Sequence, residues 1–212
     1  ALVNANGSLL IISANPLSLG VCRSPKEWGA DIAVGDCQPL GLAPNFGGPS
    51  AGYITAREKL IRKMPGRISG LTLDTEGRRG FVLTLQAREQ HIKRQRATSN
   101  ICSNQALAAL ASTVYLSTLG DEGVRQVARR NMDNAAYAFK TLTAVPGVEA
   151  AFGGAFFNEF TLDLATAGFV AGVPERKLKE EADPGRLIVA VTEKRTKGEI
   201  DALAAALREV LV

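Results

Sequence analysis

The sequence predicts an α/β protein with a mostly parallel sheet, and three observations support this class. Short, nearly continuous apolar runs at 8–13, 31–34 and 52–55 have the length and composition of strands buried on both faces. Segments with helical periodicity alternate with these runs, as expected for a sheet covered by helices. The 212 residues, 46% of them apolar, are sufficient to bury a substantial core.

The first three strands are expected at those apolar runs, and residues 56–64 are predicted to form a helix that stops before Pro65. A parallel sheet of three strands is too small to cover both of its faces. We therefore expect the chain to be the second half of a larger protein.

The second half of the chain has a different organisation. A strand is expected at 81–85, followed by two helices at 104–119 and 121–143 that are separated by Gly120. The first helix is expected to have one apolar face, made of Leu107, Leu110, Ala111 and Val114.

The remaining residues are predicted to form a small α+β domain. Strands are expected near 157–162 and 187–191. A capping box from Thr196 to Glu199 predicts the start of the final helix. The apolar stripe of this helix is expected at Ile200, Leu203, Leu207, Val210 and Leu211.

The composition argues against several classes of protein. No apolar run reaches the roughly 18 residues of a membrane span, and the first residues lack the pattern of a signal peptide. The three cysteines are far from metal-ligand spacing, which is typical of reduced thiols in a cytoplasmic protein. With a single histidine, His91, a histidine-rich metal site is not expected.

Much of the positive charge is concentrated in two runs, 57–67 and 88–96, although the net charge is only +4. A basic nucleic-acid-binding module is one alternative, but no aromatic stacking platform or known binding motif accompanies the runs. A solvated helix face or a surface for an acidic partner explains them better. The second run contains Arg88, Lys93, Arg94 and Arg96.

Residues 35–49 contain four glycines and three prolines, which is typical of a loop that holds a ligand. The loop has no Lys, His, Ser or Thr, and its only nucleophile is Cys37. Because no histidine is nearby in sequence to activate this thiol, we expect it to be buried and inert. The glycines at 47 and 48 form either a tight turn or part of a subunit interface.

Several long strings give the chain a family resemblance. It closely resembles subunit 1, the α subunit, of the glycine decarboxylase P-proteins of the glycine cleavage system. The resemblance covers most of residues 7–212, and it is carried by "GADIAVGDCQPLGLAPNFGGPSAGYITAREKLIRKMPGRISG", "RRGFVLTLQAREQHIKRQRATSNICSNQALAALASTVYLSTLG", "GGAFFNEFTLDL" and "VAVTEKRTKGEIDAL".

The resemblance implies a type I pyridoxal-phosphate-dependent transferase fold with a large, mostly parallel-sheet domain and a small C-terminal α+β domain. Residues 1–120 would be the C-terminal part of the large domain, whose N-terminal half is missing, and 121–212 would be the small domain. The resemblance implies a helix between Leu164 and Phe169, where this sequence is short: either the protein lacks that helix or residues are missing from the sequence, and the segment from Pro174 to Pro184 likewise looks shortened.

The resemblance also locates the cofactor. Pyridoxal catalysis needs a lysine that binds the cofactor and an acid at the pyridine nitrogen. Here the lysine position falls around Gln38-Pro39 and the acid position at Asn15, while Lys26 and Lys59 lie elsewhere. We therefore expect no catalytic residue or metal on this chain and pyridoxal phosphate on the partner, subunit 2.

This pair of subunits would decarboxylate glycine and pass the aminomethyl group to the lipoyl arm of H-protein, without nucleic acid or membrane. A self-sufficient homodimeric type I enzyme is the alternative. Thr98 and Ser99 precede a long helix, where they either cap the helix or contact the partner's cofactor phosphate. His91 is expected to be structural or to lie at an interface, in preference to being a general base.

Overall fold

The computed structural model describes residues 3–44, 47–97, 105–164, 173–174 and 185–211. The chain divides into two compact units, and each is described by itself. The first contains Ala1–Pro16 and Arg23–Thr118, and the second contains Leu17–Cys22 and Leu119–Val212.

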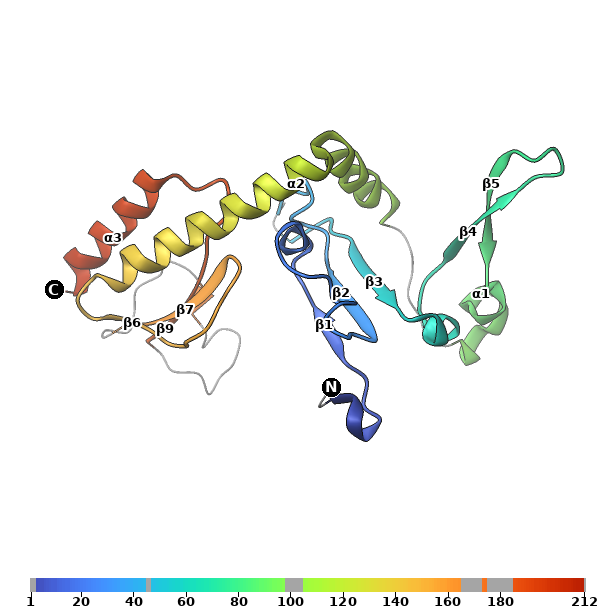
Figure 1. Cartoon of the computed structure of the whole chain (residues 1–212), viewed down its shortest axis with the longest axis horizontal. Helices are drawn as coiled ribbons and strands as arrows, with labels where there is room; N and C mark the ends of the chain where they lie inside the picture. The colour runs from blue at the N-terminus through green and yellow to red at the C-terminus, as the bar shows by residue number, and fades with distance from the viewer. Residues whose placement is uncertain (1–2, 45–46, 98–104, 165–172, 175–184, 212) are drawn as a thin grey trace. The chain divides into compact units, whose positions relative to one another are not determined.

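A three-stranded sheet in the first unit confirms the three strands expected in the first part of the sequence (Figure 1). Its strands are β1 (Ile11–Ser13), β2 (Ile32–Asp36) and β3 (Gly52–Ala56). Strands β1 and β2 are parallel, whereas β3 is antiparallel to β2. The antiparallel return follows from the connection, because the described part of the segment between β2 and β3 (37–44 and 47–51) contains no crossover helix.

The first half of the chain also contains short helical turns. The expected helix over 56–64 is a 3₁₀ helix in the structure, because Pro65 closely follows it and prevents further turns. The 3₁₀ helices are η1 (Val3–Asn6), η2 (Pro16–Gly20), η3 (Glu58–Lys63), η4 (Gln86–Arg88) and η5 (Arg94–Arg96), and α1 (Gln90–Lys93) is a single α-helical turn.

A hairpin of β4 (Ile68–Leu73) and β5 (Arg79–Thr84) follows η3. The strands pair from Ile68 with Thr84 to Leu73 with Arg79. The side chain of Asp74 closes the turn by accepting hydrogen bonds from the backbone N–H groups of Glu76 and Arg78, both at 2.9 Å. Strand β5 was expected from the sequence and β4 was not.

The long helix α2 (Ala106–Thr143) is interrupted at Gly120, where φ is 62° and ψ is −176°. This confirms the predicted break between two helical segments. The predicted apolar face of the first segment is not the buried face: Leu107 is 79% exposed, whereas Ala108 and Ser112 are buried. These small side chains lie on the side of the helix from which Tyr115 closely approaches Gly41.

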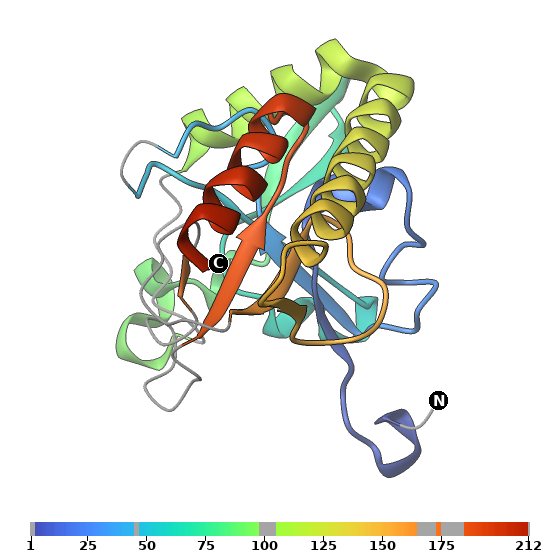
Figure 2. The ribbon, with the colours of Figure 1, turned by 90° about the vertical axis from the view of Figure 1, so that its left-hand side faces the viewer.

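The second unit has a four-stranded sheet in the order β6-β7-β9-β8. Its strands are β6 (Val148–Ala150), β7 (Glu159–Leu164), β8 (Val173–Pro174) and β9 (Arg186–Ala190). Helix α3 (Lys197–Leu211) and the C-terminal part of α2 lie side by side on one face of this sheet (Figure 2). The strands predicted near 157–162 and 187–191 are therefore confirmed.

The core of the second unit combines residues from both helices and the sheet. Leu142, Leu162 and Leu207 are at most 1% exposed. The predicted capping box is confirmed, because the backbone N–H of Thr196 donates to Glu199 and the backbone N–H of Glu199 donates to the Thr196 hydroxyl. Within the predicted apolar stripe, Ile200 and Leu207 are buried, whereas Val210 is 56% exposed.

Candidate functional site

The carboxyl ends of β1 and β2 form the candidate site in the first unit. Because these strands are parallel, with Ser13 paired to Val34, the residues that follow them meet at the same edge of the sheet. Asn15 follows β1 and Gln38 follows β2. This edge of an open α/β sheet is where ligands usually bind. The structure therefore places the two predicted cofactor positions at one edge.

The loop after β2 is held closed at both ends by Asp36. One carboxylate oxygen of Asp36 accepts a hydrogen bond from the backbone N–H of Gln38, and the other accepts one from the hydroxyl of Ser50, both at 2.6 Å. The backbone N–H of Cys37 donates to the carbonyl oxygen of Ala51 at 2.7 Å. Both oxygens of Asp36 thus have structural hydrogen bonds.

The start of the loop packs closely against β1. The hydroxyl of Tyr53 donates a hydrogen bond to the carbonyl oxygen of Ala14 at 2.7 Å, and burial raises the pKa of this hydroxyl. Gly35 lies directly beneath this pair, without space for a Cβ atom. The neutral hydroxyl of Tyr53 therefore connects β3 to the residue that follows β1, across the central strand β2.

The thiol of Cys37 is half-buried. Burial raises its pKa, and the negative charge of Asp36 raises it further. A thiol with a raised pKa stays protonated at neutral pH and is a poor nucleophile. The expected burial of Cys37 is thus only partial, while the direction of the pKa shift agrees with an inert thiol.

Neither Lys26 nor Lys59 lies at the carboxyl edge. The ammonium group of Lys59 is 3.4 Å from the carboxylate of Asp31, which immediately precedes β2 at the opposite end of the strand. Lys26 lines a pocket of about 600 Å³ that also contains Asp31. The loop at 35–49 contains no lysine. The residues at this edge therefore do not fit a pyridoxal phosphate that is covalently bound to this chain.

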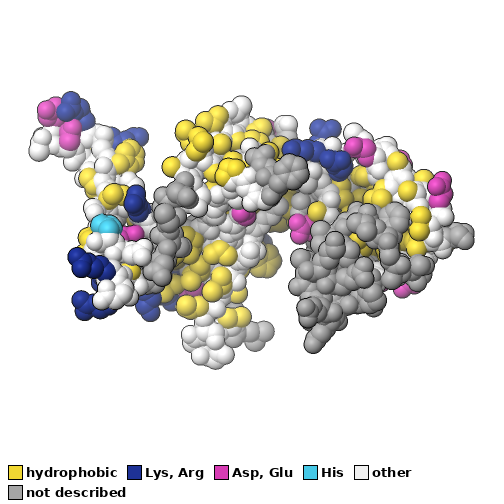
Figure 3. Space-filling view, turned by 180° about the vertical axis from the view of Figure 1, so that it is seen from behind, with side chains coloured by type: hydrophobic (Ala, Val, Ile, Leu, Met, Phe, Trp, Pro, Cys, Tyr) yellow, Lys and Arg dark blue, Asp and Glu magenta, His cyan; other side chains and the backbone are white. Residues whose placement is uncertain are grey.

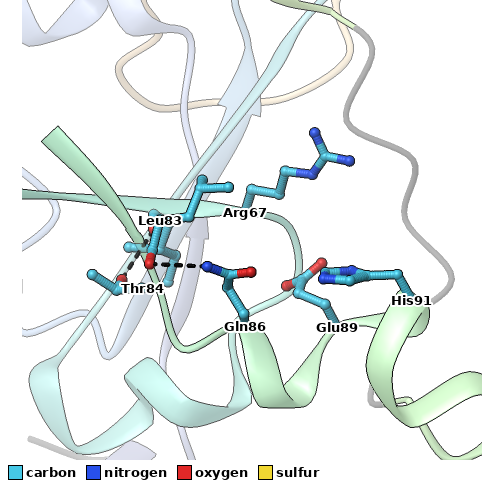
Figure 4. Close-up of a pocket in the computed structure, with 7 residues that line it drawn as sticks. Arg67, Leu83, Thr84, Gln86, Glu89 and His91 are labelled. Carbon is cyan, nitrogen blue, oxygen red and sulfur yellow. Dashed lines mark hydrogen bonds between the residues drawn. The ribbon is translucent and has the colours of Figure 1, made fainter.

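A second concave feature lies beneath the hairpin. A pocket of about 200 Å³ is lined by Arg67, Ile68, Leu83, Thr84, Gln86, Glu89 and His91 (Figure 4). The hydroxyl of Thr84 donates to the carbonyl oxygen of Ile68 at 3.0 Å, and the amide of Gln86 donates to that of Leu83 at 3.3 Å. His91 is exposed at this pocket and is not buried as a structural core residue.

Sequence reasoning missed the role of Arg88, which was expected on a solvated face or a partner-facing surface. Its side chain is only 9% exposed. The guanidinium donates hydrogen bonds to the carbonyl oxygens of Met64 and Gly66, the latter at 2.7 Å, and lies 3.6 Å from the carboxylate of Glu89. No sequence signal pointed to this role, because the acceptors are backbone carbonyl groups far from Arg88 in the sequence.

Other predicted features lie outside the described residues. These include Thr98, Ser99 and Cys102, and most of the segments 164–169 and 174–184. No cluster of three or more His, Cys, Asp or Glu side chains able to hold a metal ion occurs among the residues that the structure describes. None of the helices in the described part of the chain has the length and hydropathy of a bilayer-spanning segment.

Solved structures establish the class of the fold. The chain is similar to a cysteine desulfurase from Escherichia coli, with a TM-score of 0.60 at 14% identity, covering 100% of this chain and 54% of that chain. It is also similar to an alanine–glyoxylate aminotransferase from Nostoc, with a TM-score of 0.54 at 20% identity, covering 100% and 56%. The fold is the type I fold of pyridoxal-phosphate-dependent enzymes, as predicted.

The chain belongs to the glycine cleavage system P-protein family, whose model matches residues 1–207. A crystal structure of glycine decarboxylase (P-protein) in inhibitor-bound form gives a TM-score of 0.88 at 43% identity, covering 99% of this chain and 50% of that chain. These findings confirm the resemblance noted from the sequence.

Curated relatives agree with this assignment. The probable glycine dehydrogenase (decarboxylating) subunit 1 of Moorella thermoacetica is 51% identical, covering 96% of this chain and 48% of the relative. The protein with the same description in Citrifermentans bemidjiense is 52% identical, covering 97% and 48%. The chain thus spans about half the length of the curated relatives it matches.

Proposed function

We propose that this chain is the C-terminal portion of subunit 1 of a two-subunit glycine decarboxylase, and that this subunit does not carry the cofactor. With subunit 2 it decarboxylates glycine and transfers the aminomethyl group to the lipoyl arm of H-protein. The observation that carries this proposal is the absence of lysine from the loop after β2, where the resemblance puts Gln38-Pro39 at the position of the cofactor-binding lysine. The relatives' description as subunit 1 supports a division of the activity between two chains.

In this proposal residues 1–120 belong to the large domain and 121–212 to the small domain. The change of compact unit between Thr118 and Leu119 supports this boundary, while Leu17–Cys22 group with the second unit. The enzyme is cytoplasmic and needs neither nucleic acid nor membrane. The nucleic-acid-binding alternative has no support among the relatives.

The central experiment separates the two subunits. Full-length subunit 1 is purified alone and together with subunit 2, and the visible absorbance of lysine-bound pyridoxal phosphate is recorded. Borohydride reduction and mass spectrometry then identify the modified chain. We expect the label on subunit 2 only, and glycine-dependent exchange of carbon dioxide only when both subunits and H-protein are present.

A self-sufficient homodimer would give the opposite result. If full-length subunit 1 alone were labelled on a lysine other than Lys26 and Lys59, or if it exchanged carbon dioxide without subunit 2, the proposed division of roles would be wrong. Lys26 and Lys59 serve as internal markers, because a label on either would show adventitious modification at the other end of β2.

We further propose that Thr98 and Ser99 contact the phosphate of the partner's cofactor. Because a hydrogen bond to a charged group is worth about 1.5–3 kcal/mol, the Thr98→Ala variant should bind pyridoxal phosphate about tenfold more weakly in the two-subunit complex. Thr113→Ala, an exposed threonine on α2, is the matched control. Unchanged cofactor affinity in Thr98→Ala and Ser99→Ala would leave helix capping as their role.

A further inference from the structure

The two basic runs, which are separated in sequence by the β4–β5 hairpin, are joined in the first unit through Arg88. Its guanidinium donates hydrogen bonds to the carbonyl oxygens of Met64 and Gly66, which lie near the end of the first run. The same arginine begins the second run and pairs with Glu89 at 3.6 Å. The pocket beneath the hairpin makes a second connection, since Arg67 and His91 both line it.

The resulting surface is strongly positive. The two runs contain nine basic and two acidic side chains, a net charge of +7, although the whole chain carries only +4. The remainder of the chain is therefore net negative. Figure 3 shows Lys and Arg side chains gathered beside the single histidine.

Six exposed cations form what we call the basic surface. They are Arg62, Lys63, Arg67, Lys93, Arg94 and Arg96. Across the described ranges of the chain, none of the six has an acidic side chain within ion-pair distance. The other basic residues of the two runs are engaged within the chain: Arg57 and Lys59 pair with the buried Asp31, and the side chain of Arg88 is only 9% exposed. The exposed charges are therefore free to meet another molecule.

We propose that the basic surface is the docking site for an acidic segment of a partner protein, which seats a carboxylate in the pocket beside Arg67. The acidic side chain would meet Arg67 and the amide of Gln86, whereas the pocket's own carboxylate, Glu89, is offset by Arg88. The proposal rests on the proposed function in one respect, because an enzyme that passes a group to a carrier must dock that carrier.

The chemistry of the surface favours an acidic protein over a nucleic acid. Neither basic run contains Phe, Tyr or Trp, so the surface offers no platform for base stacking. Complementary charge accelerates the encounter of two proteins and makes it sensitive to ionic strength. Transient docking of a carrier, which must leave after each transfer, is suited to such an interaction.

The test uses the full-length subunit 1–subunit 2 complex and a fluorescein-labelled peptide of ten glutamates, with fluorescence anisotropy as the readout. The surface variant changes Arg62, Lys63, Lys93 and Arg96 to Gln. The control variant makes the same charge change in the second unit, where Arg129, Arg130, Lys140 and Arg208 are also exposed. A decalysine peptide and a mixed-sequence DNA duplex complete the set of probes.

We expect the surface variant to bind the glutamate peptide at least about tenfold more weakly, the control to change less than about twofold, and binding to weaken between about 20 and 200 mM salt. Equal weakening in both variants would overturn the proposal, since only overall charge would matter. Tighter binding of DNA, lost in the surface variant, would assign the surface to nucleic acid. Carbon dioxide exchange measured on the same complex tests the proposed function separately from the docking surface. A complex without exchange would refute the proposed function, whereas the peptide measurements alone decide the docking proposal.

Discussion

Gly35, in β2, is the residue whose replacement should be most damaging to the candidate site. An added Cβ would overlap both the carbonyl oxygen of Ala14 and the ring of Tyr53. Because one of these is a backbone atom that cannot rotate away, Gly35→Ala should lower the free energy of unfolding by about 1–3 kcal/mol. Urea titration of the full-length protein measures this change.

The matched control is Gly80→Ala in β5, where an added Cβ meets nothing within 4 Å. We expect its free energy of unfolding to change by less than about 0.5 kcal/mol. Equal destabilisation by the two substitutions would show that the close approach at Gly35 is unimportant.

Asp31 predicts a specific dependence of stability on pH. Its side chain is 3% exposed, and the hydrogen bond from the backbone N–H of Leu10, with Lys59 and Arg57 nearby, lowers its pKa. A carboxyl whose pKa is lower in the folded state stabilises the fold fully above its ordinary value of about 3.9, and this contribution is lost as the pH falls through the folded value.

We therefore expect Asp31→Asn to be less stable than the natural protein at pH 7, and the difference to shrink as the pH falls below about 3.9. Urea midpoints measured between neutral and acidic pH test this. Asp133→Asn, which removes an exposed carboxylate of α2, is the control. A difference between Asp31→Asn and the natural protein that stays constant with pH would contradict the assignment.

The sequence predicted which residues follow the strands at the candidate site, but it did not predict the backbone contacts of Arg88. Gln38 and Asn15 were correctly placed after two strands because apolar runs mark parallel strands and their ends share an edge. The burial of Arg88 could not be foreseen, since its partners are backbone carbonyls, which every residue has. Contacts of this kind depend on the path of the chain and leave no pattern in the sequence.

Gly120 defines the break in α2 at the scale of the element. Its φ of 62° with ψ of −176° lies in a region of backbone conformation that only glycine adopts readily. Gly120→Ala should therefore lower the free energy of unfolding by about 1–3 kcal/mol although an added Cβ would meet no neighbouring atom. The measurement is thermal or urea unfolding followed by far-ultraviolet circular dichroism.

Gly153→Ala is a suitable control for this prediction, because that position also has open space and its φ is not positive. The control should change stability by less than about 0.5 kcal/mol. If Gly120→Ala were neutral, α2 would be able to adopt another conformation at the break.

Two elements show why periodicity alone was insufficient. Strand β4 was missed because Ser69, Gly70 and Thr72 give it a weak apolar pattern, and it is defined by its pairing with β5. The first segment of α2 has a clear apolar stripe, yet it buries Ala108 and Ser112 instead. The helix packs closely against the loop at Gly41 on that side, which requires small side chains. A hydrophobic pattern alone does not show whether an apolar helix face packs within its own chain or contacts another chain.

At the scale of the whole molecule, the exposed apolar surface is unusually large. On one face of the hairpin, Leu71, Leu73 and Phe81 are each 66–70% exposed, and Leu107 and Leu110 are exposed on α2. Contiguous apolar patches of this kind mark interaction sites or cause association. We therefore expect the 212-residue chain expressed by itself to bind the dye 8-anilinonaphthalene sulfonate and to associate at micromolar concentration.

The hairpin face provides the check. Leu71→Ser combined with Phe81→Thr should reduce dye fluorescence and light scattering, whereas Val210→Thr, at an exposed position of α3, should not. An unchanged signal in the hairpin variant would show that the dye binds elsewhere.

The segment Leu17–Cys22 has a consequence for any attempt to dissect the protein. The chain on either side of it belongs to the first unit, yet Leu17 is 4% exposed, and Gly20 lies against Ala128 of the second unit's helix. A fragment that starts after Gly120 would lack residues 17–22 and would leave the surface of Ala128 exposed to solvent. A single proteolytic cut in α2 would likewise not release an intact C-terminal piece. Separating the two units requires grafting residues 17–22 onto the fragment or permuting the chain.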